Sequence, residues 1–505
     1  MFKRSLSSVH PQYHLFARQP RLQHAAFLSN IPSFASTRHT EVKKPATPKP
    51  PSPSKPLPRQ VLKYSFAAFA LLAASIASAY ELTHLYTEYV AMSPESDEEV
   101  KKWGWDFATY WNGDTSRGGT DPQLSHRVRH LIHAAWSASE WDFGPNANIQ
   151  STSASDSAQP RFKVLDARLL TTEKYLRAAI EFTEAKNTTS DSDSSTLAQL
   201  YLQHALILEQ MEPCFWNEAK QQFHKAWKHL PDASHRGFLA WKLGDINERL
   251  GLDAEAQEWW DKAINIVQER HPNHSPPTIA VPQSPLLQRI LFSTLISKSA
   301  YLARHNQLKE ARHLEESALD LLRSIHPPDS LASSTPPQAL HALYLLQRSS
   351  LFSIHLAEVL HAQKRKWSLS AQYLQSAAES SGRVARMLTD GQAAEAIQTS
   401  TGIPSSHKKL VSVYDSSRSM NKPAHVLLRD ARRTAAEAWN LLGVLYENHQ
   451  GNKSLRALEC FQQAMAWAGC TNPDGTQQVA DSTLEADWRI YKGNYERLNS
   501  QISAK

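Results

Sequence analysis

Between residues 197 and 468 the hydrophobic positions recur at helical spacing, in segments long enough for pairs of amphipathic helices. In three segments an alanine is followed by an aromatic residue four positions on and by a second alanine three further on. These residues are Ala219, Phe223 and Ala226 in 197–231, Ala256, Trp260 and Ala263 in 235–270, and Ala457, Phe461 and Ala464 in 434–468. Small residues let two helices approach closely and large ones fill the remaining space, so the pattern predicts stacked helical hairpins.

The first helix of a pair carries the complementary half of this pattern. Its positions are Leu243 and Gly244 in the second copy, and Trp439, Leu442, Gly443 and Tyr446 in the third. Pro231 follows the first copy, and Ala219 and Ala256 lie 37 residues apart. These positions and this period resemble the tetratricopeptide repeat, which is about 34 residues long.

Two further segments match the repeat pattern more loosely. The segment 286–325 has Ala311 and Ala318 with Glu315 at the aromatic position, and the segment 339–381 has Ala371 and Ala378 after Trp367. Only 16 glycines occur in 505 residues, and Pro-rich stretches at 272–285 and 327–337 separate hairpins. We therefore expect an all-α, tetratricopeptide-like helical-hairpin superhelix over residues 197–505.

An apolar run, Phe66–Tyr80, lies well before this array. Counted from Val61, with Lys63 snorkelling to the interface, it reaches the 20 residues that a membrane span requires. We predict a transmembrane helix at 61–80, behind a Pro-rich linker at 45–60. A buried helix of a soluble protein is the alternative, and the small residues Ala77-Ser78-Ala79 resemble a processing site.

The first 44 residues are typical of a mitochondrial transit peptide, because they are basic, Ser-rich and almost free of acids. Residues 1–60 carry a net charge of +9, and the rest of the chain carries −3. Positive charge before the span and acids after it predict a matrix N-terminus and a C-terminal domain in the intermembrane space, on a single-pass inner-membrane protein. The folded part lacks a basic stripe, so nucleic-acid binding is not expected.

Residues 81–196 form a juxtamembrane region that we expect to be helical with disordered loops. Helices are predicted at 124–141 and at 171–186, with polar loops at 145–160 and 187–196. The aromatic stretch 103–111 either lies at the lipid surface or caps the helical array, and we favour the cap.

The sequence shows none of the motifs that would indicate a catalytic, cofactor or metal site. Gly-rich phosphate loops, H-E-x-x-H, G-x-S-x-G and C-x-x-C are absent, and the three cysteines are expected to be small buried hydrophobes. His126, His130 and His133 can share one helix face, but Arg127 and Arg129 flank them without a nearby acid. We expect that face to be a solvated surface.

A protein-binding groove is the remaining function that the repeats predict, since tetratricopeptide arrays bind partners along their first helices. Aromatic residues with acids beside them suit extended or helical peptides, although several of these side chains could instead pack between repeats. The predicted groove residues are Tyr201, His204, Phe238, Trp241, Asp245, Glu248, Asn440 and Glu447.

The order of presequence, Pro-rich segment, single span, acidic juxtamembrane stretch and divergent repeats resembles a fungal family, the tetratricopeptide adaptor subunits of the inner-membrane i-AAA protease. The resemblance implies binding of unfolded or misplaced inner-membrane proteins and their delivery to the AAA protease, together with a second adaptor subunit. An assembly factor for a respiratory-chain complex is an alternative. A mitochondrial import receptor is another, although His204 and Leu208, or Trp241 and Asp245, replace the Lys and Asn clamp of related chaperone-docking domains.

Overall fold

The computed structural model is all-α apart from one antiparallel ribbon of β1 (Gly469–Thr471) and β2 (Gln477–Val479). The predicted transit peptide, nearly all of the Pro-rich linker and Pro231 lie outside the described residues. The structure describes residues 59–112, 118–140, 167–186, 194–230, 232–268, 280–326, 328, 331, 333–390, 410–451, 454–471, 477–479 and 484–503.

Most helices form pairs that are consecutive in the chain and pack against each other. The pairs are α4 (His126–Glu140) with α5 (Ala167–Lys186), α6 (Ser194–Gln210) with α7 (Trp216–His229), α8 (Ala233–Arg249) with α9 (Asp253–Val267), α10 (Pro285–Arg304) with α11 (Leu308–Ser324), α12 (Pro336–Ala362) with α13 (Trp367–Asp390), and α15 (Arg418–Gln450) with α16 (Leu455–Ala468). The remaining elements are α2 (Arg59–Tyr86), η2 (Thr87–Ala91), α3 (Glu98–Lys102), η4 (Pro213–Phe215), α14 (Ser412–Asp415) and α17 (Glu485–Ser503), which packs on α16. The predicted helical-hairpin superhelix is confirmed, and it begins with α4 and α5, upstream of residue 197.

The glycines of the repeat pattern make room for the aromatic residues of the second helices. A Cβ atom on Gly244 would lie 2.3 Å from Cδ1 of Trp260, and one on Gly443 would lie 2.7 Å from Cε1 of Phe461. The Trp260 and Phe461 side chains are 1% and 0% exposed. Each glycine therefore lets two helices approach until a large ring fills the space between them.

The looser copies keep the alanines and differ elsewhere. Ala311 and Ala318 of α11 are fully buried, and so is Glu315 at the aromatic position, whose carboxylate oxygens have no hydrogen-bond partner among the described residues. Burial, together with nearby acids, raises the pKa of Glu315 well above its usual value. In the last copy, α15 begins at Arg418, well before the predicted start at 434.

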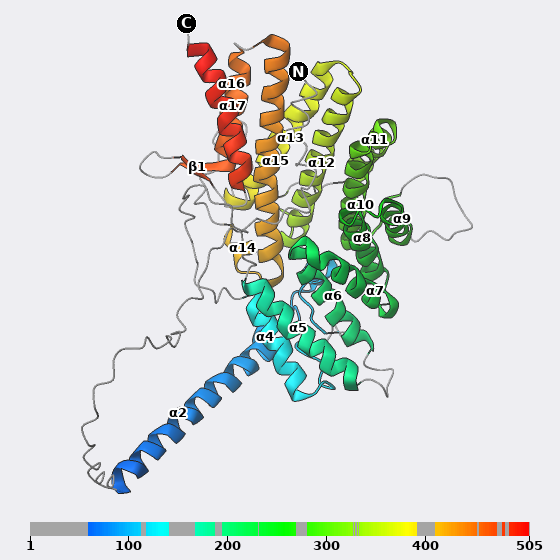
Figure 1. Ribbon diagram of the computed structural model, residues 1–505. Helices are drawn as coiled ribbons and strands as arrows, with labels where there is room; N and C mark the ends of the chain where they lie inside the picture. The colour runs from blue at the N-terminus through cyan, green and yellow to red at the C-terminus, as the bar shows by residue number, and fades with distance from the viewer. Residues whose placement is uncertain are drawn as a thin grey trace, which may run out of the picture.

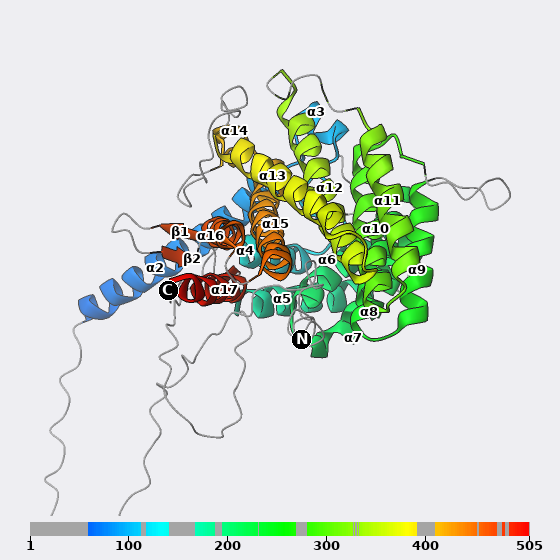
Figure 2. The ribbon, with the colours of Figure 1, turned by 90° about the horizontal axis from the view of Figure 1, so that it is seen from above.

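The helix pairs follow one another around an arc, as Figure 2 shows from above. An exposed ion pair links the first and last helix pairs, because Nζ of Lys422 in α15 lies 3.0 Å from Oε1 of Glu140 in α4. Helix α2 projects away from this body as a single rod (Figure 1).

Helix α2 contains the predicted span 61–80 and, among the described residues, is the helix long and apolar enough to cross a membrane. Its large apolar side chains point into solvent: Phe66 is 75% exposed, Phe69 69% and Leu71 70%. Within the described residues, this part of α2 exposes its apolar side chains on all sides, as a membrane-spanning helix would.

The prediction for the cysteines is correct for one and wrong for another. Cys460 lies buried in α16, and burial raises the pKa of its thiol to about 12. Cys214 is exposed, because it lies in η4, a surface turn between α6 and α7.

Candidate binding groove

The segment that follows α2 and η2 returns to the array and runs along its first helices. We call residues 93–112 the strap. It starts at the beginning of α15, where the Arg418 guanidinium donates to the carbonyl oxygen of Ser93 and, over 2.7 Å, to its hydroxyl oxygen. Beside it, the Ser419 hydroxyl donates to the carboxylate of Glu95. The first turn of α15 therefore fixes the start of the strap.

The middle of the strap is held by α12 and α10. Trp105 Nε1 donates to the carbonyl oxygen of Pro337 over 2.9 Å. Arg289 donates to the carbonyl oxygen of Gly104 over 2.6 Å, and its guanidinium stacks on the Trp105 ring at 4.0 Å. Burial lowers the pKa of Arg289 to about 10. A side chain at Gly104 is disfavoured, because its φ is +62° and a Cβ would lie 3.0 Å from Cβ of Leu286.

The far end of the strap lies on α8 and α6. Phe107 packs edge to face on Phe238 of α8, with ring centroids 5.5 Å apart. The carbonyl oxygen of Tyr110 accepts two hydrogen bonds from α6, from Gln199 Nε2 at 2.9 Å and Gln203 Nε2 at 3.0 Å. Two glutamines one turn apart thus recognise a single main-chain carbonyl.

The strap therefore meets α15, α12, α10, α8 and α6 in turn, which is the reverse of their order in the chain. Figure 2 shows its short helix α3 beside α12. The strap is irregular, with α3 and two turns along its length, yet it follows the first helices, along which repeat proteins of this class bind peptides. The aromatic stretch 103–111, expected to cap the array, lies instead along these first helices, since Trp105 and Phe107 serve as anchors of the strap.

Of the eight predicted groove residues, Phe238 contacts the strap. Trp241 packs on Phe238, with ring centroids 5.6 Å apart, and donates its indole N–H to Ser297 Oγ over 3.3 Å. The other six join helices of the array. Their partners are Glu184 for Tyr201 (2.5 Å), Glu173 for His204 (3.5 Å), Trp260 for Asp245 (3.0 Å), Arg304 for Glu248, Asn494 for Asn440 (2.9 Å) and Arg497 for Glu447 (2.7 Å).

The side chains that hold the strap's main chain were not among the predicted groove residues. They are Gln199, Gln203, Arg289 and Arg418. The spacing of Gln199 and Gln203, one helical turn apart on a mostly apolar first helix, is a signal that could have found them.

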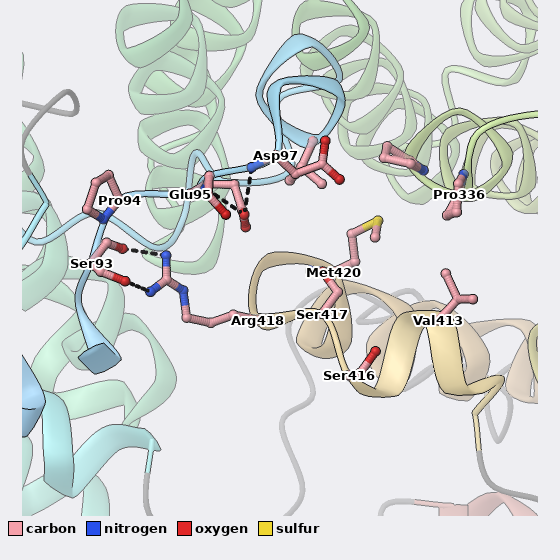
Figure 3. A pocket seen from close by; sticks show the side chains of 13 residues that line it. Ser93, Pro94, Glu95, Asp97, Pro336, Val413, Ser416, Ser417, Arg418 and Met420 are labelled. Carbon is pink, nitrogen blue, oxygen red and sulfur yellow. Dashed lines mark hydrogen bonds between the residues drawn. The ribbon is translucent and has the colours of Figure 1, made fainter. Parts of the chain in front are cut away.

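A pocket of about 390 Å³ lies where the strap enters the array (Figure 3). The hydrogen bonds between Arg418 and Ser93 close one side of it, and Met420 and Pro336 supply apolar walls. Burial alone would raise the pKa of the Glu95 carboxyl, but hydrogen bonds from the Ser419 hydroxyl and from main-chain N–H groups outweigh it and lower that pKa. The pocket is thus the junction between strap and array.

The end of α2 is fixed to α4 by a buried polar cluster, which we call the joint. Glu88 of η2 accepts hydrogen bonds from the Thr120 hydroxyl at 2.8 Å, from Arg129 Nη2 at 2.9 Å and from His133 Nε2 at 2.5 Å. Nδ1 of His84 lies 3.0 Å from Nδ1 of His133. The carboxylate side chain is only 10% exposed, so the joint is a desolvated ion-pair network.

Beside the joint, Glu81 of α2 and His126 and His130 of α4 bring three possible metal-ligand atoms within 4.8 Å of one another. The expectation that no acid lies near the histidines of 126–133 is wrong. The acids are Glu81 of α2 and Glu88 of η2, which the fold brings next to α4.

No known protein-family model matches this chain, and no curated protein matches it either. The resemblance to protease adaptors rests on the layout and the repeat residues alone.

Proposed function

We propose that this protein is a non-enzymatic adaptor that is held on a membrane by α2 and binds extended segments of unfolded proteins along its first helices. One observation carries the proposal: the first helices already hold a segment of the chain, the strap, through hydrogen bonds to the main-chain carbonyls of Ser93, Gly104 and Tyr110. Donors from side chains to carbonyl oxygens suit any polypeptide, since every residue offers that acceptor. Aromatic contacts such as that of Phe238 add affinity without strict sequence choice.

The strap and a client would compete for the same donors. The apparent affinity for a client falls by the fraction of molecules whose groove is free, so weakening the strap should tighten client binding. A groove with a purely structural role would not bind a client more tightly when the strap is weakened.

The proposed location, clients and partner protease come from the resemblance to inner-membrane protease adaptors. We place the protein in the mitochondrial inner membrane, with the array in the intermembrane space, and its clients are unfolded or misplaced membrane proteins handed to an AAA protease. The exposed apolar surface of α2 supports attachment to a membrane, and the joint fixes the array directly behind that helix, where a client leaving the bilayer could reach it.

A binding measurement tests the groove. Full-length protein in nanodiscs would be titrated against a fluorescently labelled, permanently unfolded protein, and anisotropy would be recorded. Phe107→Ala removes an aromatic anchor of the strap worth about 1–2 kcal/mol, so client binding should tighten roughly five- to thirtyfold. Tyr175→Ala, which removes a 38% exposed ring on the second helix α5, is the matched control and should change nothing. Binding that is absent, or that weakens in Phe107→Ala, would overturn the proposal.

Two measurements in mitochondria test the proposed inner-membrane location and the protease partner. A C-terminal tag should resist protease in intact mitochondria and be digested in mitoplasts; digestion in intact mitochondria sinks the inner-membrane placement. Affinity capture of the tagged protein should recover an AAA protease. Recovery of respiratory subunits without that protease would favour the assembly-factor alternative.

A further inference from the structure

Four histidines and one carboxylate gather where α2 meets the surface of α4, beside the joint. His126 and His130 lie one turn apart on α4, and their Nε2 atoms are 2.9 Å apart. Glu81 of α2 brings a carboxylate oxygen within 4.8 Å of both. The ring of His84, also from α2, lies 3.8 Å from the ring of His130, centroid to centroid. Two helices distant in the sequence thus converge their ligand atoms on one point.

The histidine nitrogens of this cluster face one another across α2 and α4. His133 Nε2 faces the Glu88 carboxylate at 2.5 Å, and its Nδ1 lies 3.0 Å from Nδ1 of His84. Nδ1 of His130 is buried without a hydrogen-bond partner among the described residues, and its Nε2 faces that of His126. Imidazole nitrogens are common ligands of transition metals.

The nearby cations do not occupy this point. The Arg127 guanidinium stacks on the Phe182 ring at 4.0 Å, and Arg129 pairs with Glu88. Both positive charges are thereby directed at partners other than the facing nitrogens of His126 and His130.

We propose that Glu81, His126 and His130 bind a divalent transition metal of the Zn²⁺ class, with His84 or water at the fourth position. Two imidazoles and a carboxylate match the ligand preferences of Zn²⁺ and Cu²⁺ and not those of Mg²⁺ or Ca²⁺. Ligand atoms of a tetrahedral zinc site lie roughly 3.3 Å apart, given zinc–nitrogen bonds of about 2.0–2.1 Å. The nitrogen pair is already near that spacing, and the exposed Glu81 side chain has room to close the remaining gap.

A metal at this position would tie the membrane helix to the first hairpin, because its ligands come from both. The inference is independent of the proposed client binding, since it concerns the attachment of α2 and not the groove.

Metal titration of the full-length protein tests the site. The protein, prepared without a polyhistidine tag, would be stripped with a chelator, placed in nanodiscs and titrated with Zn²⁺ against a chromophoric competitor. Wild type should bind one Zn²⁺ per chain at this site, and His126→Gln/His130→Gln should weaken that affinity at least tenfold. His305→Gln/His313→Gln, which removes two exposed histidines elsewhere, should leave it unchanged.

Glu81→Gln is the second variant, because it changes the ligand set from the α2 side and leaves α4 intact. It should also weaken binding, while circular dichroism shows the fold retained. Electron paramagnetic resonance of the Cu²⁺-loaded protein should show coupling to nitrogen that the double histidine variant loses. Equal Zn²⁺ affinity in wild type and the double variant would mean a hydrogen-bonded histidine chain without a metal, and would overturn the inference.

Discussion

Gly244→Ala tests the close approach of α8 and α9 on which each repeat depends. The added Cβ would meet three atoms of the Trp260 ring, at 2.3, 2.4 and 2.9 Å, where carbon atoms normally lie about 3.5–4.0 Å apart. The ring cannot turn away freely, because it is 1% exposed and its Nε1 donates to Asp245 over 3.0 Å. The two helices must therefore separate by about 1 Å.

Overpacking of this kind costs about 1–3 kcal/mol, and loss of the hydrogen bond to a buried carboxyl adds about 1 kcal/mol. Alanine is more favourable than glycine inside a helix by about 1 kcal/mol, which offsets part of this cost. The net result should be a loss of about 2 kcal/mol. Gly493→Ala in α17 is the matched control, because no described neighbouring atom lies within 4 Å of the position of an added Cβ, and it should stabilise the protein by up to about 1 kcal/mol.

Urea unfolding followed by circular dichroism gives the global free energy of unfolding, and hydrogen exchange gives the local one across α8 and α9. Array proteins unfold in units, so the local measurement is the sharper of the two. Trp260→Phe should rescue part of the loss in the double variant. A Gly244→Ala variant as stable as wild type would refute this account of the repeat.

Three further predictions concern the buried carboxyl of Glu437, the strap and helix α2. Burial raises the pKa of Glu437 to about 8, so the stability that its protonated form contributes is complete below about pH 4.5 and is lost as the pH rises to about 8. As the pH rises from about 4.5 to 8, the free energy of unfolding of Glu437→Gln, measured with urea, should exceed that of wild type by up to about 4 kcal/mol. Glu447→Gln should show no such gain. Arg289→Leu removes the charged side chain of α10 that donates to the strap, a hydrogen bond worth about 1.5–3 kcal/mol. Hydrogen exchange of the main-chain amides at 100–112 should therefore become at least tenfold faster. Unchanged exchange rates would contradict this attachment of the strap. Leu72→Arg adds about 2.5–3.5 kcal/mol to insertion of α2 and should make the protein extractable by alkaline carbonate, unlike Leu455→Arg on the exposed face of α16.

The sequence predicted the hairpins because their determinants are local. Gly244 and Trp260, or Gly443 and Phe461, lie within one helical pair, so a fixed spacing records their contact. The apolar composition of α2 is likewise a property of consecutive residues. Where the pattern was weakest, at Glu315, the structure keeps the helix pair and buries an unpaired carboxyl, since tertiary packing overrides one unfavourable side chain.

The strap and the joint could not be predicted in the same way. Trp105 and Pro337 are 232 residues apart, and Ser93 and Arg418 are 325 apart, so no periodicity records either contact. The six predicted groove residues that join helices occupy the expected first helices, but spacing alone does not tell a residue that faces the groove from one that faces the next helix.

The position of the strap between two fixed points has a consequence for the proposed function. Glu88 and Thr120, on either side of it, are joined by a hydrogen bond within the joint, so the strap is a loop closed at its base. Its release needs only the loss of its own contacts, while α2 stays attached to α4. A closed loop also rebinds as an intramolecular competitor, at an effective concentration of about millimolar. A client dissolved in the surrounding compartment competes with the strap at a disadvantage, so its apparent affinity is weakened but still measurable in a titration. A client anchored in the same membrane reaches a comparable local concentration, so the strap would select for membrane-bound clients without any recognition of their sequence.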